Sequence, residues 1–399
     1  MAHLIWFLWY AIPIALIAGI MLCIAVLWGN QIDLPFYPRF ALVVFAAMGA
    51  ARPFWQSLFG GSFWTPVKWI PFAFALDVWF FTSLTLFAML CLRGLVNVIG
   101  TTLLHGTVLI DPANVYVSCG MLAVSFVIAL YGVYQGYAPP TVTTYEVAIR
   151  NLPDKADGYT IAFVSDTHIC RTIRRKRVHE IVNRTNALKA NLIALGGDYQ
   201  DGFLEELRPK LEVFVRLTAP DGVYGVMGNH EAYGWDRHAR AAFYRNNGIE
   251  FLNNQHVTIK HQDGTPLFTL AGITDPAVWD LEEASISPSK ARNIVRPSMD
   301  KALEGAEENL PVIMLSHRPK AFKKAPPQVA LMLSGHTHGG SAPIFNLITR
   351  ATNGGYVAGE YKRGNQTLIV SRGAQQWMGW AFRLFNPAEI VLVTLSKAK

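Results

Sequence analysis

Cysteine is scarce in this chain of 399 residues, which contains only four. Cys23, Cys91 and Cys119 lie in apolar segments, and Cys170 is alone in the polar part of the chain. This distribution excludes a disulfide framework, which would have marked an oxidising compartment. Several catalytic motifs are also missing. There is no Gly-Lys pair and so no Walker A loop, and no G-x-S-x-G, H-E-x-x-H or C-x-x-C motif occurs.

Charge is almost absent from the first third of the sequence. Residues 1–137 carry only seven acidic or basic side chains, which are Asp33, Asp77, Asp111, Arg39, Arg52, Lys68 and Arg93. The whole chain is 51% hydrophobic. It is too apolar for a wholly soluble protein and too long for one ordinary domain. We therefore predict a membrane domain over 1–137 and a water-soluble part after it.

Long apolar runs divide the membrane domain into about four predicted transmembrane helices, at 4–28, 36–58, 69–92 and 115–137. The first run has no charge and exceeds the ~20 residues that span a bilayer, even with Pro13 inside it. It lacks the basic start and the cleavage site of a signal peptide. The second run is interrupted by Arg52 and Pro53, so its helix is the least regular of the four.

Asp77 is the one acidic residue within an apolar run. A carboxylate inside a membrane is a functional candidate. Because Asp77 lies only about two turns from the start of its helix, a place near the lipid headgroups is favoured. The basic residues that flank the spans are divided equally between the two sides, so the positive-inside rule leaves the orientation open. We expect a multi-pass protein of the cell membrane, which in a bacterium is the inner membrane.

The polar part begins after a linker that we place at 138–150, where Pro139 and Pro140 break the last helix. In 151–399, short apolar runs alternate with helix-like stretches, the pattern of an α/β domain. Runs that end in Asp, Asn or His occupy 160–166, 192–198, 223–229, 312–317 and 329–336. Predicted helices lie at 174–189, 203–217 and 236–247, and further strands at 257–259, 267–271, 367–371 and 390–395. We expect two packed sheets covered by helices.

The polar residues at the ends of the five runs are typical metal ligands. They are Asp166, His168, Asp198, Asn229, His230, His317, His336 and His338. In layered α/β folds the carboxyl ends of strands meet along one edge, so these side chains should converge. Each one alone would be an ordinary helix cap or turn residue. Their recurrence at the same position in five runs favours a functional site.

The ordered series of motifs carries a resemblance to a known family. Asp166-x-His168, Gly197-Asp198, Gly228-Asn229-His230-Glu231, Ser316-His317 and Gly335-His336-x-His338 resemble the calcineurin-like metallophosphoesterases over roughly 155–395. The apolar front and the segment from Arg383 to Ile390 are similar to the membrane-anchored bacterial branch with YkuE and YaeI-type proteins. The resemblance implies a two-sheet α/β sandwich behind the transmembrane helices.

The same resemblance implies a ligand set for two divalent metal ions. One ion would be held by Asp166, His168, Asp198 and His338. The other would be held by Asp198, Asn229, His317 and His336, with the Asp198 carboxylate bridging the two. Imidazole with carboxylate and amide oxygen suits Mn, Fe or Zn better than Mg or Ca. Two such ions clamp the attacking and leaving oxygens of an in-line displacement and activate a water molecule.

His230 is not a ligand in this scheme. The resemblance implies that it donates a proton to the leaving oxygen or hydrogen-bonds the phosphoryl group, which a titratable imidazole can do at neutral pH. The basic run at 171–177 follows the first motif. Two interpretations of it stay open, a rim that attracts phosphate or anionic lipid and a solvated helix start. A nucleic-acid partner is not expected, since the run has no interleaved aromatic residues.

We therefore expect a membrane-anchored dinuclear-metal hydrolase that cleaves phosphodiester or pyrophosphate bonds, with manganese among the candidate metals. A substrate of the UDP-diacylglucosamine type, a lipid pyrophosphate, is one alternative. A metal-binding membrane sensor or scaffold without turnover is another, and a transporter with a regulatory domain is a third. The sequence predicts no oligomeric state. It predicts a phosphoester substrate, which is lipid-linked in one version of the hypothesis, and does not identify it further.

Overall fold

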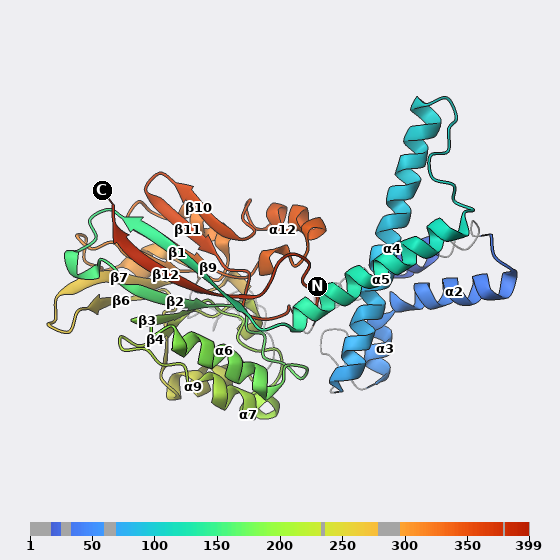
Figure 1. Cartoon of the computed structure of the whole chain (residues 1–399). Helices are drawn as coiled ribbons and strands as arrows, with labels where there is room; N and C mark the ends of the chain where they lie inside the picture. Colours follow the sequence, from blue (N-terminus) through green and yellow to red (C-terminus); the bar gives the residue numbers. More distant parts are fainter. Residues whose placement is uncertain are drawn as a thin grey trace, which may run out of the picture. The chain divides into compact units, whose positions relative to one another are not determined.

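The computed structural model describes residues 17–24, 33–59, 69–232, 236–277, 296–377 and 380–398. The chain divides into two compact units, Met1–Gln135 and Gly136–Lys399. Among these residues the first unit is helical, drawn in blue to teal in Figure 1, and the strands lie in the second.

Four helices of the first unit have defined bounds, namely α2 (Phe36–Gly49), α3 (Arg52–Leu58), α4 (Ile70–Leu103) and α5 (Val115–Tyr137). Among the described residues, α4 and α5 are long and apolar enough to cross a membrane. The predicted span 115–137 coincides with α5, and 69–92 is the first part of the longer α4. The span 36–58 forms two helices rather than one, because the chain turns at 50–51 ahead of Pro53. Of the span 4–28, only 17–24 lies among the described residues, and that stretch is helical.

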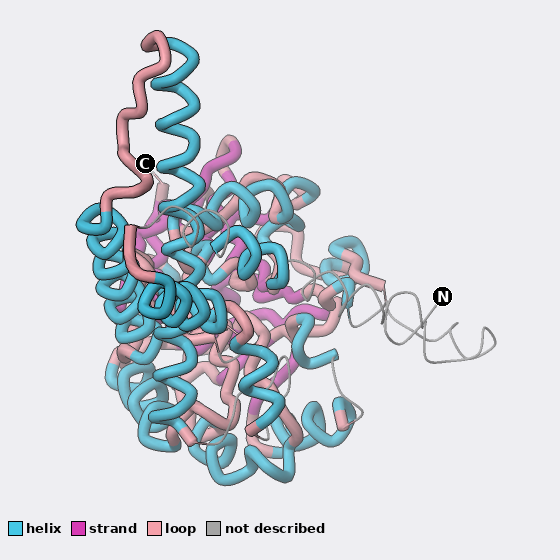
Figure 2. Tube along the Cα trace, turned by 90° about the vertical axis from the view of Figure 1, so that its right-hand side faces the viewer, coloured by secondary structure: helices cyan, strands magenta, loops and turns pink. Residues whose placement is uncertain are grey.

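The loop after α4 runs back along the end of that helix, where Figure 2 shows it in pink beside the cyan coil. The amide of Asn97 fixes it there. Asn97 Nδ2 donates to the carbonyl of Ile110 at 2.8 Å and Asn97 Oδ1 accepts from the Ile110 N–H at 2.8 Å. This reciprocal pair satisfies backbone groups that the loop could not pair by itself.

Asp77 forms an ion pair that the sequence analysis did not predict. It is fully buried and accepts a hydrogen bond of 2.5 Å from Nε of Arg52. Arg52 is itself 1% exposed, at the start of α3. The fold buries both charges together, because a buried carboxylate is stable only with a partner. The place of Asp77 near the lipid headgroups stays a prediction, since burial within the protein does not fix its depth in a membrane.

The second unit is built on two six-stranded sheets, which are layered in Figure 1. The first has the order β1-β12-β2-β3-β4-β5, with strands β1 (Thr141–Ile149), β2 (Thr160–Val164), β3 (Leu192–Leu195), β4 (Val223–Gly225), β5 (Ile249–Phe251) and β12 (Glu389–Lys397). The second has the order β10-β11-β9-β8-β7-β6, with β6 (Gln255–Lys260), β7 (Pro266–Gly272), β8 (Val312–Leu315), β9 (Val329–Ser334), β10 (Gly359–Arg363) and β11 (Gln366–Val370). The expected two-sheet α/β fold is confirmed.

The segment 138–150 is not the extended linker that we predicted. Nine of its residues form β1, which pairs in parallel with β12 from Thr141 opposite Glu389 to Ile149 opposite Lys397. The β-branched and aromatic residues of this stretch favour a strand. The sequence concealed it because β1 is an edge strand whose side chains are mostly exposed, so only two of its residues are fully buried.

Alternation along the central strands separates two apolar layers. Ile161 and Phe163 of β2 face the core between the sheets, where they belong to one cluster with Phe268, Ile313 and other strand residues. Ala162 and Val164, which alternate with them along the strand, face the helices instead. Those helices are α6 (Arg175–Ala187), α7 (Leu204–Phe214) and α9 (Arg237–Asn246), which cover the outer face of the β2-β3-β4 sheet in Figure 1.

Short elements complete the second unit. They are α8 (Asn229–Ala232), α11 (Met299–Leu303), α12 (Asn346–Thr352), η1 (Asp154–Ala156), η3 (Pro319–Lys324), η4 (His338–Gly340) and η5 (Pro343–Phe345). The helix α11 and the turn η3 bury side chains against the outer face of the second sheet. Strands β2, β3, β4 and β5 run parallel, as do β7, β8 and β9. Their carboxyl ends therefore reach the same edge of each sheet.

Candidate metal centre

All eight predicted site residues follow the carboxyl ends of strands. Asp166 and His168 follow β2, Asp198 follows β3, and Asn229 and His230 form the start of α8 after β4. His317 follows β8, and His336 and His338 follow β9 in the other sheet. The structure brings seven of them together in three overlapping groups, within each of which the ligand atoms lie within 4.8 Å of one another. The eighth, Asn229, joins the site through a contact of 3.1 Å between its Oδ1 and Nε2 of His317.

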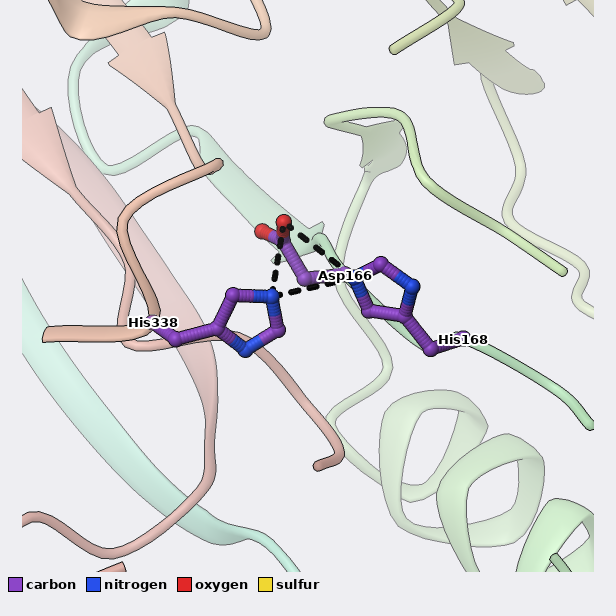
Figure 3. A group of neighbouring side chains, drawn as sticks. All are labelled: Asp166, His168 and His338. Atoms are coloured by element: carbon purple, nitrogen blue, oxygen red, sulfur yellow. Dashed lines mark hydrogen bonds and ion pairs between the residues drawn. The ribbon is translucent and has the colours of Figure 1, made fainter. Parts of the chain in front are cut away.

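The first group consists of Asp166, His168 and His338, which point toward one another in Figure 3. The Nε2 atoms of His168 and His338 are 3.0 Å apart. Oδ1 of Asp166 is 3.5 Å from Nε2 of His338 and 4.0 Å from Nε2 of His168. Two ring nitrogens and a carboxylate oxygen thus face a common point, and all three side chains are buried.

The second group is centred on His317. Its Nε2 is 3.2 Å from Oδ2 of Asp198, 3.1 Å from Oδ1 of Asn229 and 3.1 Å from Nδ1 of His336. Oδ2 of Asp198 is also 3.7 Å from Nε2 of His168. Asp198 therefore lies between the two groups, where a bridging carboxylate would be placed.

His230 lies beside both groups. Its Nε2 is 3.9 Å from Oδ2 of Asp198, and its ring stands at 87° to that of His168 with 4.6 Å between centroids. Its Nδ1 is 2.6 Å from Oδ1 of Asp201. His230 therefore forms a third group with His168 and Asp198.

Outer hydrogen bonds fix the orientation of two ligand rings. The Nδ1 of His317 donates to the carbonyl of Gly196 at 2.7 Å, and the Nδ1 of His168 is 3.0 Å from Oδ2 of Asp201. When Nδ1 carries the proton, Nε2 keeps its lone pair for a metal. These contacts therefore aim the acceptor nitrogens of both rings at the centre of the site.

The backbone at the site is unusual. Five of the predicted ligands have φ between 35° and 72°, and they are Asp166, His168, Asp198, His336 and His338. Residues other than glycine rarely adopt this left-handed region, which costs about 1–3 kcal/mol for each residue held there. The surrounding structure must compensate for this cost, and such strain is concentrated at functional sites.

Two glycines allow the ligand loops to approach one another. A Cβ at Gly335 would lie 1.8 Å from Oγ of Ser165 and 2.2 Å from Oδ2 of Asp166. A Cβ at Gly228 would lie 2.2 Å from Oδ1 of Asp198. Both positions require glycine because no side-chain atom fits beside the carboxylates.

Sequence reasoning gave no role to two acidic residues of the site. Asp201 contacts both His168 and His230, as described above. Glu231 accepts hydrogen bonds of 2.7–2.8 Å from the backbone N–H groups of Asp198, Tyr199 and Gly228, so it holds the loops after β3 and β4 together. Asp201 could have been recognised because it lies only three residues after Asp198. Glu231 could have been recognised because it directly follows His230.

Residues near the carboxyl terminus support His338. The amide of Asn386 donates to the carbonyls of His338 and Gly339 at 2.7 and 2.8 Å. The buried guanidinium of Arg383 donates to the carbonyl of Arg372 at 2.8 Å, and its Nη2 lies 3.4 Å from Nδ1 of His338. The segment from Arg383 to Ile390, which the sequence linked to the family only by resemblance, thus contributes contacts to the site.

The charges of the site shift the imidazole pKa values in opposite directions. Burial lowers the pKa of His317 and of His230, but Asp198 together with other nearby carboxylates outweighs burial and raises these pKa values to about 10 and about 9. Burial and the nearby cations hold the pKa values of His336 and His338 well below their usual range. Both of these rings are therefore neutral, the form that binds a metal.

The donor set fits divalent transition metals. Imidazole nitrogens, carboxylates and one amide oxygen converge without a thiolate, and two rings have their outer nitrogens already hydrogen-bonded. Two pairs of ring nitrogens face each other at 3.0 and 3.1 Å, and two lone pairs this close repel unless a cation or a proton lies between them. The residues present thus match the two ions that the family of dinuclear enzymes would require.

Comparisons with known proteins agree with this geometry. The family model described as calcineurin-like phosphoesterase matches residues 159–340. A transmembrane protein with a metallophosphoesterase domain from Danio rerio is 28% identical over 282 residues, covering 69% of this chain and 62% of that protein. The Bacillus subtilis metallophosphoesterase YkuE is 26% identical over 251 residues, covering 61% of this chain and 82% of that protein.

Among solved structures, a dimetal phosphatase from Danio rerio is similar at 12% identity, with a TM-score of 0.35, over 55% of this chain and 88% of that one. The chain spans 56–62% of the length of the first curated relatives that it matches. A metallophosphoesterase of Helicobacter pylori (strain J99) is 30% identical over 286 residues, and the chain covers 70% of its length. Together with the matched motifs, this similarity establishes that the chain belongs to the calcineurin-like phosphoesterase family.

Proposed function

We propose that this chain is a metal-dependent phosphoesterase anchored in a membrane, which hydrolyses phosphodiester or pyrophosphate bonds. The observation that carries the proposal is the convergence of Asp, Asn and His side chains from five strand ends around Asp198. Membership of the family supports the same activity. The two apolar helices α4 and α5 support the anchor.

The proposed ligands follow the two principal groups. One divalent ion would be held by Asp166, His168, Asp198 and His338, and the second by Asp198, Asn229, His317 and His336. Mn, Fe and Zn are the metals that this donor set suits. When bound, a pair of such ions lowers the pKa of water and stabilises charge on the phosphoryl group.

His230 would act on the leaving group. Its Nδ1 contacts Asp201 and its Nε2 faces Asp198, so Nε2 is the nitrogen that reaches the reacting phosphate. In the metal-free protein the Asp198 and Asp201 carboxylates together outweigh burial and raise the pKa of this ring to about 9, which favours the protonated form. It can give that proton to the departing oxygen, and Asp201 stabilises the resulting ring orientation.

A metal-binding scaffold without turnover is less well supported. Such a protein would not need an oriented imidazole beside the metal ligands, whereas His230 is 93% buried and held by Asp201. The anchor also gives the enzyme a physical advantage if its substrate is a lipid, because both are then confined to the same surface. The lipid-linked substrate is thus the finer form of the proposal.

The test uses the full chain purified in detergent. It is stripped of metal, reloaded with Mn, Fe or Zn, and assayed with bis(p-nitrophenyl) phosphate while its metal content is measured. Asp198→Asn should lose both metal and turnover. Asp263→Asn is a matched control, since Asp263 is an exposed hairpin residue and should leave both unchanged. Wild-type protein that binds metal but turns over no phosphoester with any of the three would support the scaffold instead.

A further inference from the structure

A pocket of about 460 Å³ opens beside the candidate metal centre. Its wall is formed by strands β1 and β10, the helix α12 and the segment at 384–386. The residues that matter most are Tyr145, Gly339, Arg350, Tyr361 and Phe385. The pocket has the size of a small-molecule site, and the proposed chemistry does not use it.

The pocket is adjacent to a predicted metal ligand. Gly339 lines it and directly follows His338 in the chain. Asn386 also lines it and donates to the carbonyls of His338 and Gly339. The pocket therefore borders the loop that carries His338, next to the place where the reacting phosphate would lie.

The polar wall of the pocket favours a negatively charged group. Of its two guanidinium groups, that of Arg372 is neutralised by Glu389, with 2.9 Å between Nε and Oε2. Glu360, on the neighbouring strand β10, forms its ion pair with Lys362, at 3.2 Å, and not with Arg350. Arg350 is exposed, and no carboxylate of the described residues forms an ion pair with it. Arg350 thus gives the pocket a positive charge, and the Tyr145 and Tyr361 side chains add phenol groups.

The rim of the pocket is apolar and exposed. Phe385 is 76% exposed at the pocket wall. The helix α12, which supplies Arg350, also exposes Leu347 by 78% and Ile348 by 65%, and none of its residues is buried. Large apolar side chains gathered beside a polar pocket are a feature of lipid-binding surfaces, and the same chain carries helices suited to a membrane.

We propose that this pocket binds the headgroup of an anionic lipid phosphoester, with one phosphate at the metal centre and a second anionic group at Arg350. The pocket is of headgroup size, so the acyl chains would lie outside it, against Phe385 and the exposed face of α12. This inference rests on the proposed function, and it narrows the substrate class to lipids with two acidic groups in the headgroup, such as lipid pyrophosphates.

For a lipid pyrophosphate the reaction balances without a co-reactant. The oxygen of water forms a bond to the terminal phosphorus, and the bond from that phosphorus to the bridging oxygen breaks. The bridging oxygen leaves with the lipid phosphate and takes a proton from His230, and the proton that the water loses restores the protonated ring. The products are orthophosphate and the lipid monophosphate, whose remaining phosphate stays opposite Arg350.

The experiment compares two substrates on the full chain in detergent, loaded with Mn. Diacylglycerol pyrophosphate in mixed micelles probes the pocket, and soluble bis(p-nitrophenyl) phosphate probes only the metal centre. Arg350→Gln should lower kcat/KM for the lipid by about tenfold or more, the usual effect of removing one charged hydrogen bond, and leave the soluble diester within about twofold. Arg216→Gln is the matched control, since Arg216 is an exposed arginine after α7.

A second variant tests the rim. Leu347→Ser combined with Ile348→Ser should raise KM for the micellar lipid and leave the soluble diester unchanged. The inference is overturned if wild-type protein hydrolyses the soluble diester but not the lipid, or if Arg350→Gln affects both substrates equally or neither. Absence of turnover with both substrates would contradict the proposed function itself, so the two failures are distinguishable.

Discussion

Asp201 orients His230 through a contact of 2.6 Å between its Oδ1 and the Nδ1 of the ring. The other oxygen of the same carboxylate lies 3.0 Å from Nδ1 of His168. One side chain therefore orients both a predicted metal ligand and the predicted proton donor. Substitutions at His230 and at Asp201 can separate the loss of the proton donor from the loss of its orientation.

His230→Ala should lower kcat by roughly 10²–10⁴-fold while the protein keeps its metal, because the proton donor is lost and the ligands remain. Asp201→Asn should have a smaller effect, about 10–100-fold on activity or metal affinity, since it only weakens the orientation of two rings. Steady-state kinetics and metal analysis of each variant measure these effects. Full turnover in His230→Ala would show that the ring has no part in proton transfer.

Glu231→Gln should destabilise the fold. The Glu231 carboxylate accepts three backbone N–H groups in loops after β3 and β4, and a neutral amide cannot accept all three with the same strength. Each buried N–H without an acceptor costs about 1–3 kcal/mol. Thermal unfolding should show a lower Tm than for Glu250→Gln, an exposed residue of β5. Equal Tm values would mean that the loops do not depend on this carboxylate.

Gly335→Ala should disrupt the metal centre with little effect on the strands. Its Cβ would overlap Ser165 and Asp166, so the loop after β9 must move by at least an ångström, at a cost of about 1–3 kcal/mol. Metal content and turnover should both fall. Gly94→Ala in α4, where a Cβ meets nothing within 4 Å, is the control and should be neutral. Normal metal binding by Gly335→Ala would contradict the packing described here.

Stability of the metal-free protein should decline at alkaline pH. The pKa values of His230 and His317 are raised from 6.5 to about 9 and about 10. A group whose pKa is raised by folding stabilises the folded state fully below its unfolded value and loses this effect as the pH passes the folded value. Tm measured after chelation should therefore fall between pH 6.5 and pH 10. In metal-loaded protein the decline in Tm that is due to His317 should be absent, because its Nε2 cannot bind a proton and a metal together.

The Arg52–Asp77 pair should show strong coupling within the first unit. Both side chains are buried and joined by a hydrogen bond of 2.5 Å, so either single change removes this ion pair from the buried charge that remains. Arg52→Gln and Asp77→Asn should each destabilise the protein by about 3–5 kcal/mol, and the double variant by less than their sum. Unfolding in detergent measures all four members of the cycle. Additive effects would show that the two charges are stabilised separately.

The strands that carry ligands could be predicted because each is a short apolar run that ends in a polar residue. The convergence of Asp166 with His338 followed from that pattern together with the rule for parallel strand ends. The strand β1 could not be recognised in the same way, because it is an edge strand with only Val147 and Ile149 buried. Its pairing with β12 depends on residues almost 250 positions away.

Other features depend on tertiary structure that no local pattern encodes. The pairing of Arg52 with Asp77 joins α3 to α4, and the sequence shows only two isolated charges. The left-handed backbone at Asp166 and His336 is likewise invisible, since both residue types are ordinary at strand ends. The role of Glu231 arises from backbone groups of two separate loops, and side-chain chemistry alone does not reveal it.

The ligands come from both sheets, and this arrangement has a consequence for the life of the protein in a cell. Residues after β2, β3 and β4 belong to one layer, and those after β8 and β9 belong to the other. Ions held between them would fasten the layers at one end, and binding to the folded state adds stability that grows with the free ion concentration. When transition metals are scarce, the resistance of this chain to proteolysis would therefore decline together with its catalytic capacity.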